Sequence, residues 1–284
     1  MSHGITTLLR DIIPEDKIGF LTHSYDIVGS KQKSVAIIEI PESLRDYEDD
    51  IAEAIMQVHR NVASVLAKES KRDGEFRTRD YKLLAGDEDT EVIHKEAGCA
   101  FRLDPRRVYF SPREVSERDR LVRKVSEGED ILVMFSGVCP IPIRIAKKFL
   151  NVRVTGIELN PYAYNYCVEN IHLNKVEDRV EAVLGDVKDV CSTLKRKFNR
   201  IIMPLPKGAY RFLDSAIPLL KEEEGVIHFY HWAREPDLFT EGENLIIAAS
   251  RKFQRTAEII ERTRVSPYSP RVWKICIDAA IKPV

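Results

Sequence analysis

The chain of 284 residues is long enough to bury one or two hydrophobic cores, and 44% hydrophobic and 31% charged residues are typical of a globular protein. Its formal net charge of −1 excludes a wholly basic chain, so a nucleic-acid partner would have to meet local basic patches. No apolar run approaches the roughly 20 residues that a membrane span requires, and the first residues lack a signal-peptide pattern. We therefore expect a cytoplasmic protein with no membrane partner.

The first part of the chain, residues 1–112, reads as a small α/β domain. Residues 34–40 (SVAIIEI) are apolar and rich in β-branched side chains, which predicts a strand that ends at Pro41. The next stretch predicts one long helix, because its apolar side chains recur at helical spacing, namely Ile51, Ile55, Val58, Val62 and Val65. Short strand-like pieces divided by glycine, aspartate and proline then complete the domain near residue 112.

Residues 113–284 alternate short apolar runs with helical stretches, which is typical of a parallel sheet covered by helices on both faces. The expected strands are residues 131–136, 153–159, 180–186, 199–206, 225–232 and 271–281. Ligands of such sheets bind at the carboxyl ends of the strands, where the strand order reverses. The predicted fold class is therefore α/β, with a Rossmann-like domain preceded by the small domain.

Five cysteines are scattered along the chain, with no CxxC pair and no histidine at ligand spacing beside them, which argues against a zinc site. Cysteine packs as a small hydrophobe, so we expect buried, reduced thiols. The five are Cys99, Cys139, Cys167, Cys191 and Cys276.

The segment FSGVCPIP, residues 135–142, joins the first of these strands to a helix. Gly137 would allow a ligand to approach the backbone closely, as in nucleotide-binding loops. However, Pro140 and Pro142 lack the N–H groups that a pyrophosphate would need, and the other two glycines of a dinucleotide loop are missing. The segment therefore argues against a nucleotide phosphate.

S-adenosylmethionine, which has no phosphate, suits this edge of the sheet better. Glu158 closes the second expected strand, where a carboxylate can accept both ribose hydroxyls, and Asp186 closes the third, near the adenine amino group. Either acid alone could be a helix cap or a solvated charge. Together with Gly137, in order on successive strand ends, they favour an S-adenosylmethionine site.

Several segments also resemble one enzyme family in their order and spacing. They are DPRRVYFSPREVSERDRL, MFSGVCP, GIELNPYAYNYCVENIHLNKVEDRV, IIMPLP and SPYSPRVWKICID. Residues 34–284 thus resemble the archaeal and eukaryotic tRNA (guanine-N1)-methyltransferases that act at position 37, and their relatives, the aminocarboxypropyltransferases of the wyosine pathway. The resemblance implies a class I, Rossmann-like fold and S-adenosylmethionine as the cofactor.

The resemblance implies roles for particular residues. Glu117 matches the family's general base, Arg77 the arginine that holds guanine O6, and Glu158 the acid that binds the cofactor ribose. Pro204 counts among the catalytic residues, because it stands where the strand-four asparagine of the methyltransferases contacts the target base. The expected cofactor site consists of Phe135, Gly137, Cys139, Glu158, Asn160, Pro161, Asp186 and Pro204.

Three departures from the family pattern leave the reaction open. Pro204 replaces the asparagine, Cys139 replaces the second glycine of the loop, and Val133 replaces an acid that commonly ends the first strand. The MPLP segment is nevertheless closer to the methyltransferase form than to the Gly-Tyr pair of the aminocarboxypropyltransferases. We expect the amino-terminal RNA-elbow domain of the methyltransferases to be absent, a feature shared with the aminocarboxypropyl branch.

The chemistry agrees with these roles. Methylation of guanine N1 requires removal of its proton, which a partly buried carboxylate such as Glu117 can accept. Negative charge then develops toward O6, where the guanidinium of Arg77 would stabilise it. The plainer interpretation of Glu117 is an ion pair on the helix surface with Arg113 or Arg120, both at neighbouring helical spacing.

Local basic stretches suit an RNA partner. Residues 99–124 hold eight Lys or Arg against four acids, and residues 251–274 hold seven against two. Tyr109, Tyr268 and Trp273 add aromatic faces, although a run of charges is more often simply solvated. The cations that we expect to contact the anticodon loop of tRNA are Arg102, Arg106, Arg107, Arg113, Arg118 and Arg271.

The segment HFYHW, residues 228–232, concentrates two histidines and three aromatic side chains at a strand end. We interpret it as strand packing with histidines at the rim, and a wall of the base pocket is the alternative.

The sequence therefore predicts a monomeric, metal-free tRNA methyltransferase of the archaeal type that acts on guanine 37. Transfer of the aminocarboxypropyl group to a wyosine precursor is the first alternative, since it depends on which sulfonium carbon faces the nucleophile. A catalytically inactive RNA-binding relative is the second, although Glu117 and Arg77 argue against it. The basic stretches disfavour a protein or small-molecule substrate.

Overall fold

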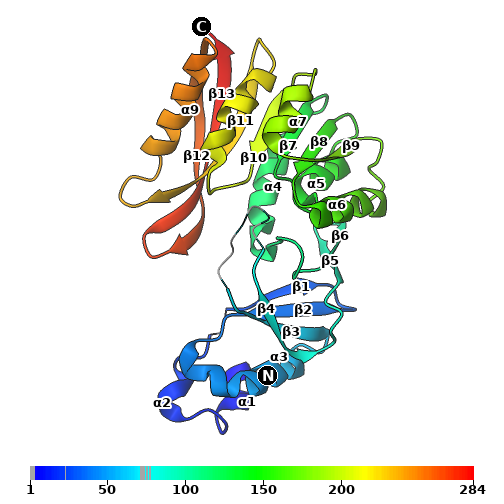
Figure 1. The fold of residues 1–284 in the computed structure, drawn as a ribbon, viewed down its shortest axis with the longest axis vertical. Helices are drawn as coiled ribbons and strands as arrows, with labels where there is room; N and C mark the ends of the chain where they lie inside the picture. The colour runs from blue at the N-terminus through cyan, green and yellow to red at the C-terminus, as the bar shows by residue number, and fades with distance from the viewer. Residues whose placement is uncertain (1–3, 23, 71–73, 75, 77) are drawn as a thin grey trace. The chain divides into compact units, whose positions relative to one another are not determined.

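The computed structural model describes residues 4–22, 24–70, 74, 76 and 78–284. The chain forms two compact units, Met1–Ser116 and Glu117–Val284 (Figure 1). Each unit has its own sheet and its own hydrophobic cluster. Within the described residues, no helix has the length and apolar character that a membrane crossing needs.

The first unit is built on a four-stranded sheet in the order β1-β2-β3-β4. Its strands are β1 (Asp26–Gly29), β2 (Ser34–Ile38), β3 (Val62–Lys68) and β4 (Tyr81–Gly86). Its described helices and 3-10 turns are α1 (Ile5–Leu9), α2 (Glu15–Ile18), η1 (Glu42–Tyr47), α3 (Glu48–Val58) and η2 (Pro112–Glu114). Because α3 connects the parallel strands β2 and β3, its Ile51 and Ile55 lie in the same buried cluster as Val65 of β3.

One predicted helix ends earlier than its apolar spacing indicates. The prediction of a single helix through Val62 and Val65 is wrong, because α3 ends at Val58 and the chain continues as β3. β3 pairs with β2 on one side and β4 on the other, and most of its side chains are buried. A strand buried on both faces has a continuous apolar run, which periodicity alone cannot distinguish from a buried helix.

A separate hairpin follows in the same unit, formed by β5 (Val92–Glu96) and β6 (Cys99–Leu103). Its two turn residues, Ala97 and Gly98, both have positive φ (47° and 76°), as a primed hairpin turn requires. Alternate residues of both strands are buried, so one face of the hairpin packs against the unit.

The second unit contains a seven-stranded sheet in the order β12-β13-β11-β10-β7-β8-β9. Its strands are β7 (Asp130–Met134), β8 (Arg153–Glu158), β9 (Val180–Leu184), β10 (Arg200–Met203), β11 (Gly225–Arg234), β12 (Arg255–Ser269) and β13 (Val272–Pro283). The five strands from β11 to β9 are parallel, and β13 and β12 extend the sheet antiparallel at one edge. The predicted Rossmann-like sheet is confirmed, and β12 is a strand that the sequence did not indicate.

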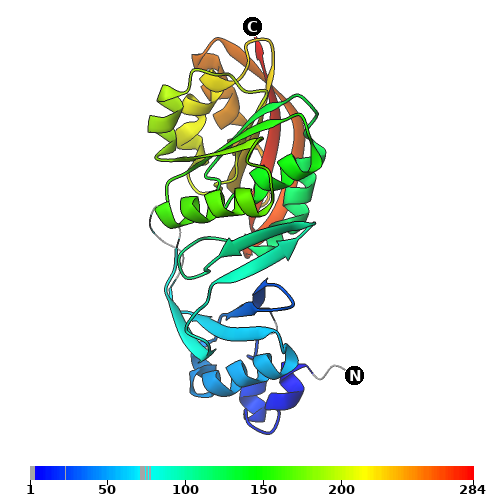
Figure 2. The same cartoon turned by 90° about the vertical axis from the view of Figure 1, so that its right-hand side faces the viewer.

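Helices cover both faces of this sheet (Figures 1 and 2). They are α4 (Val115–Arg123), α5 (Pro140–Lys148), α6 (Pro161–Leu173), α7 (Val187–Thr193), η3 (Ala209–Phe212), α8 (Leu213–Ala216), η4 (Ile217–Leu219) and α9 (Thr240–Lys252). α5 and α6 pack on β8 and β9, whereas α7, α8 and α9 enclose the main hydrophobic cluster on the other face, around Met203, Phe229 and Ile277.

The strand order reverses between β7 and β10, which are neighbours in the sheet although β8 and β9 lie between them in the sequence. Open α/β sheets bind their ligands at this switch point, beyond the carboxyl ends of the strands. Here β8 ends at Glu158 and β10 ends at Met203. β11 continues beyond its Phe229 pair with Met203 as far as Arg234, so it extends past this edge.

Candidate active site

The loop after β7 turns sharply through three residues with positive φ, which are Phe135 (56°), Gly137 (58°) and Cys139 (63°). Such angles are uncommon for residues other than glycine and are concentrated at functional sites. Backbone bonds fix the turn, because the Ser136 N–H donates to the Ile157 carbonyl (2.9 Å) and the Cys139 N–H to the Ser136 carbonyl (3.0 Å). The loop is thus held at the end of β7 and beside β8.

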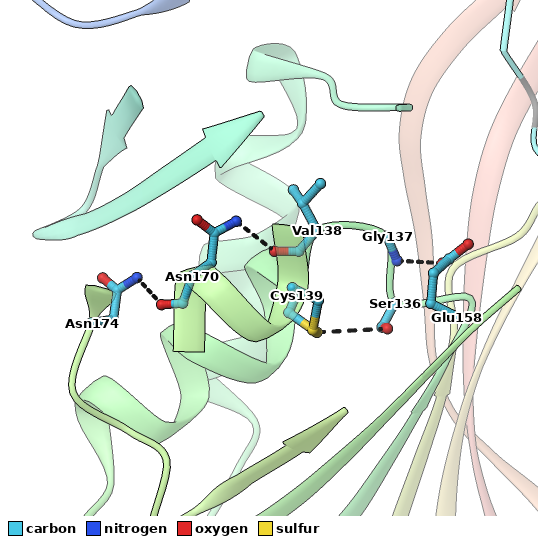
Figure 3. Close-up of a disulfide and its surroundings, with 8 residues drawn as sticks. Ser136, Gly137, Val138, Cys139, Glu158, Asn170 and Asn174 are labelled. Carbon is cyan, nitrogen blue, oxygen red and sulfur yellow. Dashed lines mark hydrogen bonds between the residues drawn. A yellow bond between two sulfur atoms is a disulfide. The ribbon is translucent and has the colours of Figure 1, made fainter. Parts of the chain in front are cut away.

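The structure brings Glu158 to this loop. Its Oε2 accepts a hydrogen bond from the Gly137 N–H (2.6 Å, Figure 3), and its Oε1 accepts one from the Asn160 N–H (2.9 Å). Burial raises the pKa of the Glu158 carboxyl, and these backbone donors oppose the shift. A carboxylate oxygen has two lone pairs, so each can also accept a ligand hydroxyl.

Two polar side chains at neighbouring strand ends cap helices. Asn160 Oδ1 accepts the Tyr162 N–H (3.0 Å) at the start of α6, whose first residue is Pro161. Asp186 accepts the Lys188 N–H (2.7 Å) at the start of α7. The helix cap that the sequence left as an alternative for Asp186 is therefore present, and Asp186 lies at the carboxyl edge of the sheet.

A disulfide joins Cys139 of the loop to Cys167 of α6 (Figure 3). The prediction that these two cysteines are reduced thiols is therefore wrong, whereas Cys99, Cys191 and Cys276 are buried and belong to no disulfide, as predicted. The two bonded cysteines are 28 positions apart in the sequence, so only the packing of α6 beside the loop brings them together. Cys139 consequently offers a cofactor no free thiol.

Two further contacts fix the same loop. Asn170 of α6 donates through Nδ2 to the Val138 carbonyl (3.2 Å, Figure 3). β8 passes so closely that a Cβ at Gly156 would lie 3.0 Å from Ser136 Oγ and 3.2 Å from Cys139 Sγ. The loop is therefore tightly connected to both α6 and β8.

Glu117 of α4 is buried and accepts hydrogen bonds from two side chains of the second unit. Arg120 donates to both carboxylate oxygens, from Nε to Oε2 (2.9 Å) and from Nη2 to Oε1 (2.8 Å). The Tyr230 hydroxyl of β11 donates to Oε1. The ion pair with Arg120 that the sequence left as an alternative is therefore present, although it is buried rather than on the surface. Arg113 pairs instead with Asp26.

The contacts continue inward from Arg120 through further polar and charged side chains. Arg120 Nη1 donates to Asp278 Oδ2 (2.7 Å), and Asp278 Oδ1 lies 2.7 Å from His228 Nδ1. His228 Nε2 lies 2.7 Å from Arg200 Nη1, and Arg200 donates to both oxygens of Glu129 (2.7 and 2.9 Å). This set is named the charge chain, and it consists of Glu117, Arg120, Asp278, His228, Arg200 and Glu129.

The protonation states of the charge chain follow from its hydrogen bonds. An arginine can only donate, so His228 Nε2 accepts from Arg200 and the ring proton is on Nδ1, which donates to Asp278. Burial lowers the pKa of His228, which agrees with a neutral ring. Burial also disfavours the charges of Asp278 and Arg120, but their hydrogen bonds outweigh it. The pKa of Asp278 therefore lies well below its ordinary value, and that of Arg120 lies above.

The sequence did not indicate these partners of Glu117. His228 and Tyr230 belong to the HFYHW segment, and the prediction of a rim histidine is wrong for His228, which is completely buried. Asp278 lies in the buried strand segment ICIDAAI. A lone charge in such a strand must find a partner, and this signal could have indicated the network.

Pro204 directly follows β10 at the carboxyl edge of the sheet. As proline it has no N–H to donate and no side-chain amide. Because Met203 pairs with Phe229, Tyr230 is the next residue of β11 at the level where β10 ends. Arg77, the other expected catalytic residue, lies outside the described residues.

The basic residues expected to contact RNA differ in their surroundings. Arg102 and Arg107 are paired with acids of the first unit. Arg118 is only 4% exposed, which contradicts its expected place on the surface. A guanidinium in such a position is held by interior contacts rather than by solvent. Arg106 and Arg271 are exposed.

Aromatic and cationic side chains gather where β11, β12 and β13 extend past the end of β10. Trp232 lies on Tyr268, with ring centroids 4.3 Å apart, and the Arg264 guanidinium lies 4.1 Å from the Trp273 ring centre. Tyr268 is 66% exposed, and Arg271 occupies the turn with φ 62°. These five residues are named the hairpin tip. Exposed aromatic rings and guanidinium groups suit unpaired nucleic-acid bases.

The Rossmann-like sheet, with Gly137, Glu158 and Asp186 at its ligand-binding edge, defines the class: a class I S-adenosylmethionine-dependent methyltransferase. Comparison with known proteins agrees. The family model described as the TRM5/TYW2 methyltransferase domain matches residues 92–260, and the one described as the TYW2 N-terminal domain matches residues 5–90. The chain belongs to the TRM5/TYW2 methyltransferase family, and the resemblance is confirmed.

Similar proteins come from both branches of this family. The tRNA (guanine(37)-N(1))-methyltransferase Trm5b of Pyrococcus abyssi is 41% identical, over 94% of this chain and 77% of its own length. The tRNA(Phe) (4-demethylwyosine(37)-C(7)) aminocarboxypropyltransferase of Methanocaldococcus jannaschii is 35% identical, over 82% of this chain and 90% of its own length. The solved complex of aTrm5 and tRNALeu matches with a TM-score of 0.84 and 30% identity, covering 99% of this chain and 78% of that one.

Proposed function

We propose that the chain is an S-adenosylmethionine-dependent tRNA methyltransferase that methylates N1 of guanine 37. One observation carries the proposal. The buried carboxylate of Glu117 accepts a hydrogen bond from Tyr230, which lies at the carboxyl edge of the sheet, and at this edge Glu158 accepts a hydrogen bond from Gly137 in the loop after β7. A base and a cofactor site at one edge are what proton removal and methyl transfer require. The 41% identity to a guanine-37 methyltransferase supports the same reaction.

The described residues fit S-adenosylmethionine. Glu158 offers carboxylate oxygens to the ribose hydroxyls, Asp186 lies at the next strand end for the adenine, and the turn at Gly137 presents backbone to the amino-acid end. When bound, the cofactor would supply a methyl group from its sulfonium, with the electron pair of that S–C bond kept by sulfur, and guanine N1 would accept the methyl with the pair freed by loss of its proton. Phe135, Asn160 and Pro204 complete the site.

Glu117 takes up the proton of guanine N1 on a carboxylate oxygen. Hydrogen bonds from Arg120 and Tyr230 hold this carboxylate in place. Oε1 accepts two of these bonds and Oε2 accepts one, so a lone pair remains on Oε2. Arg77 stabilises the negative charge that develops on O6. Proton removal and charge stabilisation are thus assigned to different residues.

The substrate is tRNA, bound through its anticodon loop. Residues 1–112 form the RNA- and substrate-binding part, and residues 113–284 form the catalytic part. Guanine 37 must be unstacked to reach Glu117, so neighbouring nucleotides need surfaces of their own. The hairpin tip suits such bases. The backbone phosphates suit the half-buried Arg102 and the exposed cations Arg106, Arg107, Arg113 and Arg271. The protein acts as a monomer in the cytoplasm.

Transfer of the aminocarboxypropyl group is the second candidate function. It is favoured by the relative from M. jannaschii and by the match of residues 5–90 to the TYW2 N-terminal domain. Both reactions use the same sulfonium but different carbons of it, so the outcome depends on which carbon faces the substrate. Pro204 lies at the carboxyl edge of the sheet and replaces the asparagine of the methyltransferases, so it offers the target base no side-chain amide. This difference could change which carbon faces the substrate.

The experiment that tests the proposal is incubation with S-adenosylmethionine and an unmodified tRNA transcript, followed by nucleoside mass spectrometry. We expect 1-methylguanosine, and no product when guanine 37 is replaced by adenine. Glu117→Gln is expected to lower the rate about 10²- to 10⁴-fold, because an amide cannot take up the proton, while cofactor affinity is retained. An aminocarboxypropyl adduct would support the second candidate. Bound cofactor and tRNA without any product would indicate an inactive relative.

A further inference from the structure

Arg120 is the branching point of the charge chain. It reaches Glu117 through Nε and Nη2 and Asp278 through Nη1, so one guanidinium serves two carboxylates. The side chains of Arg120 and Asp278 are 13% and 2% exposed. More exposed charges flank them, since Lys124 Nζ lies 3.4 Å from Asp278 Oδ2 and Glu261 Oε1 lies 3.6 Å from Arg120 Nη1.

Tyr230 approaches Glu117 from the sheet. It is 1% exposed, and its hydroxyl donates to Glu117 Oε1. Burial raises the pKa of Tyr230 well above its ordinary value, so the hydroxyl keeps its proton and remains a donor. The ring is enclosed on the sheet, with Cys276 as its partner on β13 and Lys274 Nζ 5.0 Å from the ring centre.

We propose that Tyr230, Arg120 and Asp278 are positioning residues for Glu117. In this role Tyr230 and Arg120 fix the orientation of the carboxylate, and Asp278 keeps Arg120 paired when Glu117 takes up a proton. The role rests on the proposed function, because it requires Glu117 to be the base. All three residues act through Glu117 and not on the substrate itself.

The charges before and after proton transfer explain why Arg120 needs two partners. Before transfer, the Arg120 cation faces two anions, Glu117 and Asp278. During transfer the N1–H bond breaks with its electron pair left on N1, an O–H bond forms on Glu117, and Glu117 becomes neutral. Without Asp278, Arg120 would then have no hydrogen-bonded anion and only the partly exposed Glu261, 3.6 Å from its Nη1, which is unfavourable for a mostly buried cation. With Asp278, the guanidinium stays paired in both states.

Asp278 is itself held in place. His228 donates to its Oδ1 and is fixed in turn by Arg200, which is paired with Glu129. Buried ion pairs contribute little to stability and are often replaceable by apolar residues of similar volume. A chain of buried charges that ends at the proposed base is therefore better explained by placement of that base than by stability.

A double-mutant cycle with Tyr230→Phe and Glu117→Gln tests the role, measured as single-turnover methylation of tRNA by the full chain. Phenylalanine keeps the ring and removes only the hydroxyl. We expect Tyr230→Phe to lower the rate about 10- to 100-fold through misplacement of Glu117, at unchanged Kd for S-adenosylmethionine and tRNA. In the Glu117→Gln background the same change should have no further effect, because Tyr230 acts only through Glu117.

Two more variants sharpen the test. Ser250→Ala is the control, since it removes a buried hydroxyl bond, to the Ile246 carbonyl (2.9 Å), on α9, which carries none of the proposed site residues, and it should leave the rate unchanged. Asp278→Asn removes the second anion of Arg120 but keeps the side-chain shape. It should lower the rate while cofactor affinity is retained, and a wild-type rate would contradict the pairing role.

Equal losses from Tyr230→Phe in the wild-type and Glu117→Gln backgrounds would overturn the inference, since additive effects mean that the hydroxyl acts on the fold as a whole. A wild-type rate for Tyr230→Phe would also overturn it while leaving the proposed function intact. Full activity of Glu117→Gln is the distinct outcome in which the proposed base fails and the positioning role fails with it.

Discussion

Replacing Cys139 or Cys167 with serine removes the disulfide that joins the loop after β7 to α6. In the chain-entropy model, a cross-link between residues 28 positions apart stabilises the folded state by about 3.6 kcal/mol at 25 °C. A domain of this size loses about 2–4 °C of melting temperature per kcal/mol. We therefore expect either substitution, or a reductant, to lower the melting temperature by roughly 7–14 °C.

The same change should loosen the loop without releasing it. Asn170 still bonds to the Val138 carbonyl, and the Ser136 N–H still bonds to Ile157. If the loop is less ordered before binding, part of the binding free energy is spent on ordering it, and the affinity falls. We expect the Kd for S-adenosylmethionine to rise about 3- to 10-fold, as measured by isothermal titration calorimetry.

Scanning calorimetry with and without reductant measures the stability difference, and alkylation of the denatured, unreduced protein counts free thiols. Both single variants and the double variant should lose the same amount, because each removes one cross-link. Cys191→Ser is the matched control, since it removes a free buried thiol and should keep the response to reductant. Alkylation of all cysteines without reductant, or a melting temperature that reductant does not change, would refute the reasoning.

Glu158→Gln should abolish S-adenosylmethionine binding yet stabilise the cofactor-free protein at neutral pH. Because the pKa of Glu158 is raised, the folded state binds the proton more tightly than the unfolded state. Wild-type stability therefore falls as the pH rises above the ordinary glutamate pKa of about 4.3, and this loss is absent from the variant. If the melting temperatures of the wild type and of Glu158→Gln changed with pH in the same way, this prediction would be contradicted. In the hairpin tip, Arg264→Ala and Tyr268→Ala should each weaken tRNA binding about 3- to 30-fold in filter assays with cofactor affinity unchanged. For Arg264→Ala, the slope of the logarithm of the tRNA binding constant against the logarithm of the salt concentration should also become smaller by about one. Unchanged tRNA affinity in both variants would exclude the hairpin tip as an RNA surface.

Short-range signals made the frame of the second unit predictable. The strands β8, β9 and β10 lie within the apolar runs that predicted them, and β7 begins one residue before its run, at Asp130. Gly137, Glu158 and Asp186 stand at successive strand ends. Each of these features depends on a few neighbouring residues, such as the turn at Gly137 or the proline that opens α6 at Pro161.

What the sequence did not predict depends on pairing between distant segments. β12 alternates exposed and half-buried residues, so its sequence is typical of a charged surface segment. It forms a strand because it pairs with β13. Tyr230 lies 113 positions from Glu117, and Asp278 lies 158 positions from Arg120. No local pattern specifies such contacts, because the fold of the whole sheet brings these residues together.

A double-label experiment tests most directly whether the protein is a guanine-37 methyltransferase. It uses S-adenosylmethionine with one isotope in the methyl group and a second isotope in the carboxyl group. The protein is incubated with unmodified tRNA and this cofactor, and the isotope on each recovered nucleoside is measured. We predict that only the methyl isotope reaches tRNA, and that all of it is on guanine 37. The carboxyl isotope on tRNA, or methyl isotope on another nucleoside, would contradict the proposed function.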